Sequence, residues 1–366
     1  MADASGEPIA QRGITEDGFL TDGWYLAATS DELKPGHQTR RMILGEPVML
    51  ARTAAGDVMA IRDICPHRLV ALSQGRQVNT DGEPTIECPY HGWRFGADGV
   101  CKHIPSLTGD EPYEPSKFGV RSYRVHEANG GIFIYVAHDA QSNDAPALPP
   151  PDFGDLPGNP KFIVRRDFQA HMDDAVTGLI DPGHVPYVHS QWWWRPPSAG
   201  YKIKEKAFEP SPFGWTMSKH KPTSSSFFYK MVYGDEVTSE IVFLMPGFRW
   251  ERVSNDKAQL VSLSCMTPIG PKETQVVQMT WFEGTPLLSA ALPLLRAAGR
   301  KFLQQDGDIV ALQTEGMEFQ TNMLWLDDVD TQAKWYRTSK RAWAHWRTHG
   351  GDYDNPVEAR TLRWRS

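Results

Sequence analysis

Cysteine is scarce in this sequence, with four residues among 366. They are Cys65, Cys88, Cys101 and Cys265. Four thiols are too few to cross-link a chain of this length into a disulfide framework, which indicates a reducing compartment. Any role for these cysteines is therefore expected in metal binding.

Long hydrophobic segments and long runs of one charge are absent as well. The most apolar stretch, residues 286–298, contains Ser289, Pro293 and Arg296, whereas a membrane-spanning helix needs about 20 apolar residues. The first residues, MADASGEPIAQRGITEDGF, have neither the cationic start nor the apolar core of a secretory signal. We therefore expect a cytoplasmic protein without a membrane partner. The formal charge of −7, spread along the chain, argues against nucleic acid as a partner.

The composition, 40% hydrophobic and 23% charged, is that of a folded protein, and the length suggests two domains. A small antiparallel β unit is predicted by short apolar runs between Gly and Asp turns, at 24–28, 47–52, 58–62 and 131–137. Residues 139–160, rich in Pro, Asp and Gly, are expected to form a linker. We therefore predict an N-terminal extension over 1–22, a β domain over 23–138 and a second domain over 161–366.

The second domain is expected to combine a sheet with helices in an α+β fold. Strand-like runs recur between turns from about 200 to 282, one of them SFFYKMVY at 226–233, and this pattern is typical of a meandering antiparallel sheet. From Leu287 the composition becomes helical, and breaks are expected at Pro293 and Gly307.

Two short segments in the front half each combine one cysteine with one histidine, as Cys65-Pro-His67 and Cys88-Pro-Tyr-His91. Two thiolates and two imidazoles on adjacent loops can hold a tetrahedral zinc ion or a [2Fe–2S] cluster, and the spacing alone does not decide between them. In common zinc fingers the cysteines form one pair and the histidines the other. The interleaved order suits a cluster in which one iron takes both thiolates and the other both imidazoles, as in a Rieske centre.

On these motifs the sequence resembles the Rieske non-haem iron oxygenases. The resemblance extends over GWYLAA at 23–28, CPHR at 65–68, CPYHGW at 88–93 and GVCKHIPS at 99–106. It implies an N-terminal all-β Rieske domain and a catalytic domain with a curved, helix-grip-like antiparallel sheet packed with helices. The two loops lack the further cysteines of respiratory Rieske proteins, which points to the oxygenase branch. The implied cluster, one per subunit, would be held by Cys65, His67, Cys88 and His91.

Beyond the linker, Asp181, His184 and His189 form the pattern D-x2-H-x4-H. Two histidines five residues apart can converge on one metal ion if the chain bends between them, and Pro186 would provide such a bend. Taken alone, a pair of this kind is more often structural than metal-binding. Behind a Rieske motif it predicts a mononuclear Fe(II) site, one per subunit, which needs a carboxylate as its third ligand.

The resemblance places that carboxylate on the late helix, where family members carry an acidic residue in an E-D-x-x-I-like run. The run reads QDGDI at 305–309, so Asp306 is the expected ligand. Asp308 is the alternative and Glu315 a weaker one. Gln305 departs from the pattern because it replaces the usual Glu.

A different role follows from the resemblance for Asp181. Its carboxylate would accept the N–H of His184 and link it to His91 of the partner subunit, fixing the tautomer and raising the basicity of the ligand. Such a link implies a head-to-tail ring, a homotrimer.

The resemblance implies a terminal oxygenase with O2 as co-substrate. The sequence has no G-x-G-x-x-G unit, flavin motif or plant-type ferredoxin motif, so NAD(P)H would act only through a separate reductase, with or without a ferredoxin. The expected reaction is monooxygenation of a hydrophobic or aromatic small molecule, either hydroxylation or oxidative demethylation. Aromatic side chains suit such a substrate. The pocket candidates are Trp192, Tyr229, Trp250 and Trp281.

Three alternatives stay open. The first is cis-dihydroxylation by the α subunit of an aromatic-ring dioxygenase. The second is a Rieske electron carrier or redox-sensing binding protein without oxygenase activity, and the third is a zinc-stabilised interaction module. The last two do not require the D-x2-H-x4-H pattern together with Asp306, so these residues discriminate between the classes.

Overall fold

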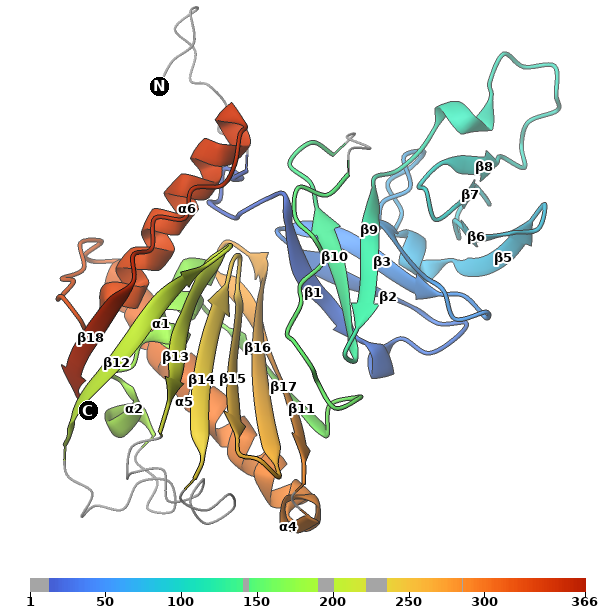
Figure 1. The fold of residues 1–366 in the computed structure, drawn as a ribbon. Coiled ribbons are helices and arrows are strands. Elements are labelled where there is room, and N and C mark those ends of the chain that lie inside the picture. The colour runs from blue at the N-terminus through green and yellow to red at the C-terminus, as the bar shows by residue number, and fades with distance from the viewer. Residues whose placement is uncertain (1–12, 141–144, 190–200, 222–235, 285) are drawn as a thin grey trace, which may run out of the picture. The chain divides into compact units, whose positions relative to one another are not determined.

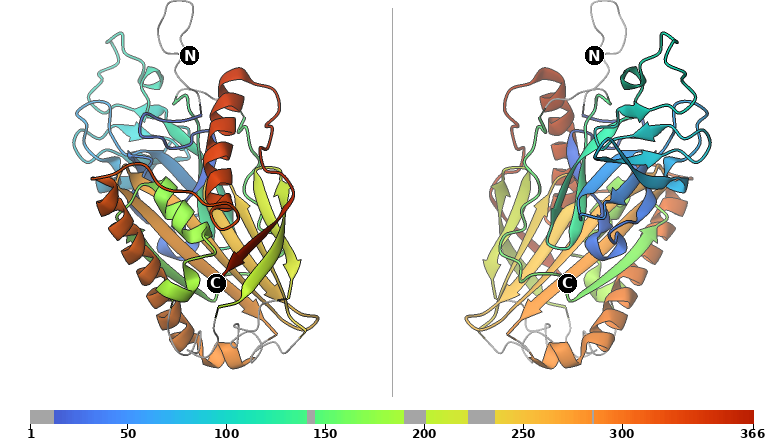
Figure 2. Two further views of the ribbon diagram at one scale, coloured as in Figure 1. Left: turned by 90° about the vertical axis from the view of Figure 1, so that its left-hand side faces the viewer. Right: turned by 90° about the vertical axis from the view of Figure 1, so that its right-hand side faces the viewer.

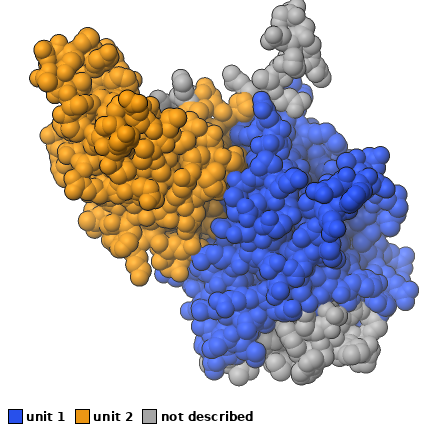
Figure 3. Space-filling view, turned by 180° about the vertical axis from the view of Figure 1, so that it is seen from behind, with its two compact units in different colours: residues 1–21, 152–366 blue, residues 22–151 orange. Residues whose placement is uncertain are grey.

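The computed structural model describes residues 13–140, 145–189, 201–221, 236–284 and 286–366. The chain divides into two compact units, residues 22–151 and residues 1–21 together with 152–366 (Figure 3). Among the described residues, no helix is both long enough and apolar enough to span a membrane.

The unit of residues 22–151 is built mainly of antiparallel strands (Figure 1). They are β1 (Gly23–Thr29), β2 (Gln38–Ile43), β3 (Glu46–Arg52), β4 (Val58–Arg62), β5 (Arg76–Thr80), β6 (Glu83–Glu87), β7 (Arg94–Phe95), β8 (Cys101–His103), β9 (Ser122–Ala128) and β10 (Gly131–Val136), with short 3-10 helices at Ser30–Glu32, Leu72–Gln74 and Pro115–Lys117. One sheet has the order β1-β10-β9-β4-β3-β2 and a second the order β5-β6-β7-β8.

The strands predicted in this unit correspond to β1, β3, β4 and β10. Strands β1 and β10 are buried along their whole length, which explains why their sequences, GWYLAAT and GIFIYV, are almost continuously apolar rather than alternating. The prediction of an all-β front domain is confirmed.

The second unit contains a curved sheet of eight antiparallel strands with helices against it (Figures 1 and 2). The strands are β11 (Phe162–Phe168), β12 (Ile203–Ser211), β13 (Gly214–His220), β14 (Thr238–Leu244), β15 (Phe248–Ser254), β16 (Gln259–Gly270), β17 (Glu273–Glu283) and β18 (Arg360–Arg365), and the helices are α1 (Met172–Ile180), α2 (Val185–Val188), α4 (Pro286–Ala290), α5 (Leu292–Met317) and α6 (Thr331–His349). The strand order is β11-β17-β16-β15-β14-β13-β12-β18.

Helix α5 packs along β11, and α1 packs against β16 and β17. Helices α1, α2 and α5 therefore lie on one face of the curved sheet (Figure 2). The predicted α+β fold with a curved antiparallel sheet is confirmed. The strand predicted at 226–233 lies outside the described residues.

Helix α5 contradicts one prediction, because it continues through Gly307 without a break. A Cβ at residue 307 would lie 2.7 Å from Arg166 Nε and 3.1 Å from the Phe168 ring. The missing side chain therefore lets β11 approach the helix closely. The break predicted at Pro293 falls at the boundary between α4 and α5, where proline occupies the first turn of α5 and its missing N–H costs no hydrogen bond.

Sequence reasoning missed helix α6 and strand β18. Tyr336, Trp343 and Trp346 form part of the buried side of α6, and the Trp343 Nε1–H donates to the carbonyl of Thr21 at 2.9 Å. Strand β18 pairs with β12 and extends the sheet at that edge. The signal that could have predicted α6 is the recurrence of apolar residues at helical spacing between charged ones.

Candidate metal centres

Two loops in the unit of residues 22–151 fold alike and carry the first four candidate ligands. In each loop the cysteine N–H donates to the carbonyl five residues later, at 2.9 Å from Cys65 and 2.8 Å from Cys88. The cysteine carbonyl accepts from the N–H four residues later, at 2.9 Å and 3.1 Å respectively. That fourth residue has positive φ in both loops, +61° at Leu69 and +72° at Gly92. The two cysteines therefore occupy equivalent positions in equivalent turns.

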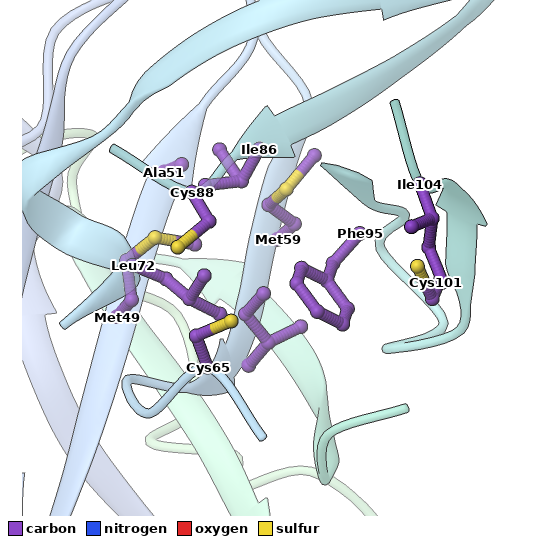
Figure 4. Close-up of a cluster of buried hydrophobic side chains, with 11 residues drawn as sticks. Met49, Ala51, Met59, Cys65, Leu72, Ile86, Cys88, Phe95, Cys101 and Ile104 are labelled. Atoms are coloured by element: carbon purple, nitrogen blue, oxygen red, sulfur yellow. The ribbon is translucent and has the colours of Figure 1, made fainter. Parts of the chain in front are cut away.

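The thiols of these loops are buried and the imidazoles are exposed. Cys65 and Cys88 lie among buried apolar side chains (Figure 4), whereas the exposed rings of His67 and His91 have centroids 4.5 Å apart. Burial and the neighbouring Cys88 thiol raise the pKa of the Cys65 thiol to about 11, so bound iron is needed to keep it as a thiolate. Two thiols on one side and two imidazoles on the other fit the donor set of a Rieske cluster.

Aromatic rings support the two imidazoles. The Trp93 ring stacks on His67 with centroids 4.9 Å apart and an interplanar angle of 11°, and the Tyr90 ring lies 3.8 Å from that of His91. Trp93 is part of the CPYHGW motif, but the motif alone predicts no role for it. Its stacking restricts the orientation of the His67 ring.

The second candidate centre is formed where the chain leaves α1 and enters α2. Asp181 follows the last residue of α1, and its Oδ1 accepts the Gly183 N–H at 2.6 Å. Helix α2 is a single turn between His184 and His189, with Pro186 in its first turn. This short turn carries the chain around so that both imidazoles face the same carboxylate.

That carboxylate belongs to Asp306 on α5. Its Oδ1 lies 3.0 Å from His189 Nε2 and 3.5 Å from His184 Nε2, and the three candidate ligand atoms lie within 4.8 Å of one another. The structure thus brings together the two histidines and the aspartate that the sequence singled out.

The site is largely buried, with side-chain exposures of 17% for His184, 5% for His189 and 14% for Asp306. Burial alone would lower the pKa of His184, but the Asp181 and Asp306 carboxylates raise it to about 9. Burial alone would raise the pKa of Asp306, but the two histidines hold it below its usual value. The carboxylates therefore favour positive charge between these side chains.

The donor atoms suit a divalent cation. Asp306 Oδ1 is buried and makes no hydrogen bond of acceptable geometry within the described part of the chain, although His189 Nε2 lies nearby. Two imidazole nitrogens and one carboxylate oxygen aimed at one point are the donor set of the 2-His-1-carboxylate sites of non-haem Fe(II) oxygenases.

Each histidine also has a side-chain oxygen behind it. His189 Nδ1 lies within hydrogen-bond distance of Gln305 Oε1, at 3.2 Å, whereas His184 Nδ1 lies 3.6 Å from Asp181 Oδ2 and makes no hydrogen bond within the described residues. The His189 ring further packs on Phe302, with centroids 4.4 Å apart. Both imidazoles therefore turn Nε2 toward Asp306 and Nδ1 toward an acceptor. The sequence predicts Asp181 next to His184, where the structure places it, and predicts no role for Gln305.

The alternative carboxylates lie elsewhere. Asp308 accepts a hydrogen bond from Arg166 Nη2 at 2.6 Å and is half exposed. Glu315 is exposed, more than two turns further along α5. The geometry favours Asp306 over both.

A pocket of about 340 Å³ opens beside the second centre. Asp181, His184 and Asp306 contribute to its wall, together with Ile309 and Leu312 of α5. One side of the candidate metal position is therefore reached through a pocket with an apolar rim.

Of the four aromatic pocket candidates, the two that the structure describes, Trp250 and Trp281, do not line this pocket. Trp281 is fully buried and its Nε1–H donates to the carbonyl of Gly158 at 3.0 Å. Trp250 packs edge-on against Phe153, with centroids 5.4 Å apart. Both indoles thus pack against the segment that precedes β11. Trp192 and Tyr229 lie outside the described residues.

Comparisons with known proteins support the assignment of the first centre as a Rieske cluster site. Residues 23–124 match the Rieske [2Fe–2S] domain family. Dicamba O-demethylase, oxygenase component, from Stenotrophomonas maltophilia is 37% identical over 177 residues, which are 47% of this chain and 48% of that protein. The 3-chlorobenzoate-3,4-dioxygenase oxygenase subunit of Comamonas testosteroni is 31% identical over 49% of this chain and 40% of that protein. The chain spans about half the length of these curated relatives.

The fold of the chain is also similar to that of solved structures. Dicamba monooxygenase bound to dicamba superposes with a TM-score of 0.70 at 22% identity, covering 88% of this chain and 97% of that one. The chain thus contains a Rieske [2Fe–2S] domain and is similar to Rieske oxygenase components, in sequence over about half of its length and in fold over most of it.

Proposed function

We propose that the protein is the terminal oxygenase of a Rieske-type system and uses O2 to monooxygenate a hydrophobic or aromatic small molecule. The observation that carries this proposal is the presence, in one chain, of a Rieske domain and a buried His-His-Asp set. An electron carrier needs only the Rieske domain, and a zinc-stabilised module needs neither a cluster nor the second site.

Ferrous iron held by His184, His189 and Asp306 would supply the activation of O2, because this donor set leaves coordination positions open. The protein contributes orientation and exclusion of water. The Asp181 carboxylate lies 3.6 Å behind His184 Nδ1, and a slight approach would let it accept the Nδ1–H and leave the Nε2 lone pair for the metal.

The proposed assembly is a head-to-tail homotrimer in which Asp181 links His184 to His91 of the partner subunit. Ile309 and Leu312, 45% and 63% exposed, lie at the pocket that contains Asp181. The cluster loops in turn expose Leu69 by 74% and Tyr90 by 62%. These exposed apolar side chains would be covered if the cluster loops of one copy of the chain met the pocket of another, which supports the proposed assembly.

The substrate class and the electron supply rest on the relatives. Of their names, dicamba O-demethylase supports oxidative O-demethylation, and 3-chlorobenzoate-3,4-dioxygenase supports a small chlorinated aromatic substrate. Electrons would come from NAD(P)H through a separate reductase, with or without a ferredoxin. The second of these names also keeps cis-dihydroxylation as the second candidate reaction.

The test is reductase-supported turnover under ¹⁸O2 with a panel containing dicamba, 3-chlorobenzoate and other methoxylated or carboxylated aromatic compounds. We expect substrate-dependent O2 uptake with one labelled oxygen in the product, or release of formaldehyde from a methyl ether. Two labelled oxygens would support dihydroxylation instead. A protein with both iron centres loaded and the cluster reduced that consumes no O2 with any compound would contradict the oxygenase.

A further inference from the structure

Gln305 directly precedes Asp306 on α5, and its side chain reaches the His189 ring from the opposite edge. Gln305 Oε1 lies 3.2 Å from His189 Nδ1, while Asp306 Oδ1 lies 3.0 Å from His189 Nε2. We propose that Gln305 is a positioning residue that keeps the proton of His189 on Nδ1 and aims Nε2 at the metal. This inference rests on the metal site of the proposed function.

The chemistry of the two side chains supports this assignment. A neutral imidazole carries one N–H, and only its unprotonated nitrogen can bind a metal. An amide oxygen accepts and does not donate, so when a metal ion lies between Nε2 and Asp306, the contact of Gln305 with Nδ1 favours the tautomer with a free Nε2 lone pair. Because the His189 side chain is only 5% exposed, little water is available to replace this acceptor.

Consecutive positions on α5 explain how two side chains can hold one ring. Neighbouring residues of an α-helix point about 100° apart, so Gln305 and Asp306 can reach different edges of the same imidazole. Contacts of Gly307 and Asp308, which follow these two residues on α5, fix the rotation of the helix about its axis. Gly307 allows Arg166 to cross the helix closely, and Arg166 then pairs with Asp308 at 2.6 Å.

The charge of the acceptor distinguishes the two histidines. His184 is backed by the Asp181 carboxylate, whereas His189 is backed by a neutral amide. Asp181 and Asp306 together balance the two positive charges of a divalent ion. The Glu of the family pattern would place a third negative charge next to Asp306, whereas glutamine supplies an acceptor for His189 without that charge.

The experiment measures Co(II) affinity of the cluster-loaded, full-length protein by anaerobic equilibrium dialysis, with the Co(II) electron paramagnetic resonance signal as a second readout. Gln305→Leu removes the acceptor and should weaken binding by about 10–100-fold with a changed signal, the usual effect of losing a hydrogen-bond partner of a metal-binding histidine. Gln305→Glu keeps an acceptor and should bind within about tenfold of the unaltered protein. Gln304→Leu, the same change at the exposed neighbouring position, should leave the affinity unaltered.

Equal affinity and an identical signal for Gln305→Leu and the unaltered protein would overturn the inference while leaving the metal site in place. If Gln305→Leu fails to fold, Gln305→Ala removes the same acceptor without added bulk and is read in the same way. If the unaltered protein binds Co(II) no better than His184→Ala, the metal site itself is wrong, and both the inference and the proposed function fail.

Discussion

The two candidate centres of this chain differ in how they are built. The cluster ligands lie on two loops between Cys65 and His91 whose backbone hydrogen bonds repeat residue for residue. The second centre joins a single-turn helix to α5, and its carboxylate lies far along the chain from its histidines. When all ligands lie on short local turns, their spacing in the sequence is enough to predict the site. When one ligand comes from a distant helix, the prediction also requires knowing which side of that helix faces the other ligands.

The largest effect is expected from the first centre. Cys88→Ser should abolish the cluster and with it all reductase-driven O2 uptake, and it should destabilise the unit of residues 22–151, since Cys88 lies in its buried interior. His184→Ala should instead keep the Rieske absorption spectrum while losing O2 uptake. The visible spectrum and oxygen-electrode traces of the two variants check this contrast. Full turnover by His184→Ala would show that the second centre is wrongly assigned.

Two substitutions on one helix sharpen the choice of carboxylate at the second centre. Asp306→Asn should lower the affinity for the second metal and the turnover by at least about 100-fold, because it removes a direct ligand. Asp308→Asn should leave metal affinity within about threefold, since it breaks only a partly exposed ion pair with Arg166. Metal content and turnover of the purified variants provide the measurement. The reverse ranking would make Asp308 the ligand.

The D-x2-H-x4-H pattern and the Cys-His pairs could be found in the sequence because all their members lie on short segments. Asp306 and Asp308 could not be separated there, since two carboxylates two positions apart on a helix differ by direction alone. Contacts of Arg166 and Gly307 set that direction, and they involve β11, which sequence spacing does not connect to α5. In the sequence Gln305 is only a departure from a family pattern, because its role depends on His189, which lies far away along the chain.

The packing around α5 gives a smaller effect with a matched control. Gly307→Ala should destabilise the second unit by about 1–3 kcal/mol, because a Cβ there overlaps Arg166 and Phe168. Gly316→Ala in the same helix meets no atom within 4 Å and should be neutral or stabilise by up to about 1 kcal/mol. Denaturant unfolding of both variants measures the difference. Equal stabilities would mean that β11 does not need the gap at residue 307.

The smallest effect is expected for Trp281, whose side chain is buried in the domain interior and does not line the pocket at the second centre. Trp281→Phe removes one buried hydrogen bond to the Gly158 carbonyl and should cost about 1 kcal/mol of stability, with a further loss from the smaller ring. The KM for the substrate found in the turnover screen should stay within about twofold. A KM increase of tenfold or more would indicate that Trp281 does line the substrate pocket.

The most direct test of two iron centres in one chain is a count of iron and acid-labile sulfide in anaerobically purified protein, made side by side with Asp306→Asn. We expect about three irons and two sulfides per chain in the unaltered protein, and about two irons and two sulfides in the variant. Two irons and two sulfides in both proteins, unchanged after ferrous iron is added, would contradict the second centre. Zinc without sulfide would contradict the first.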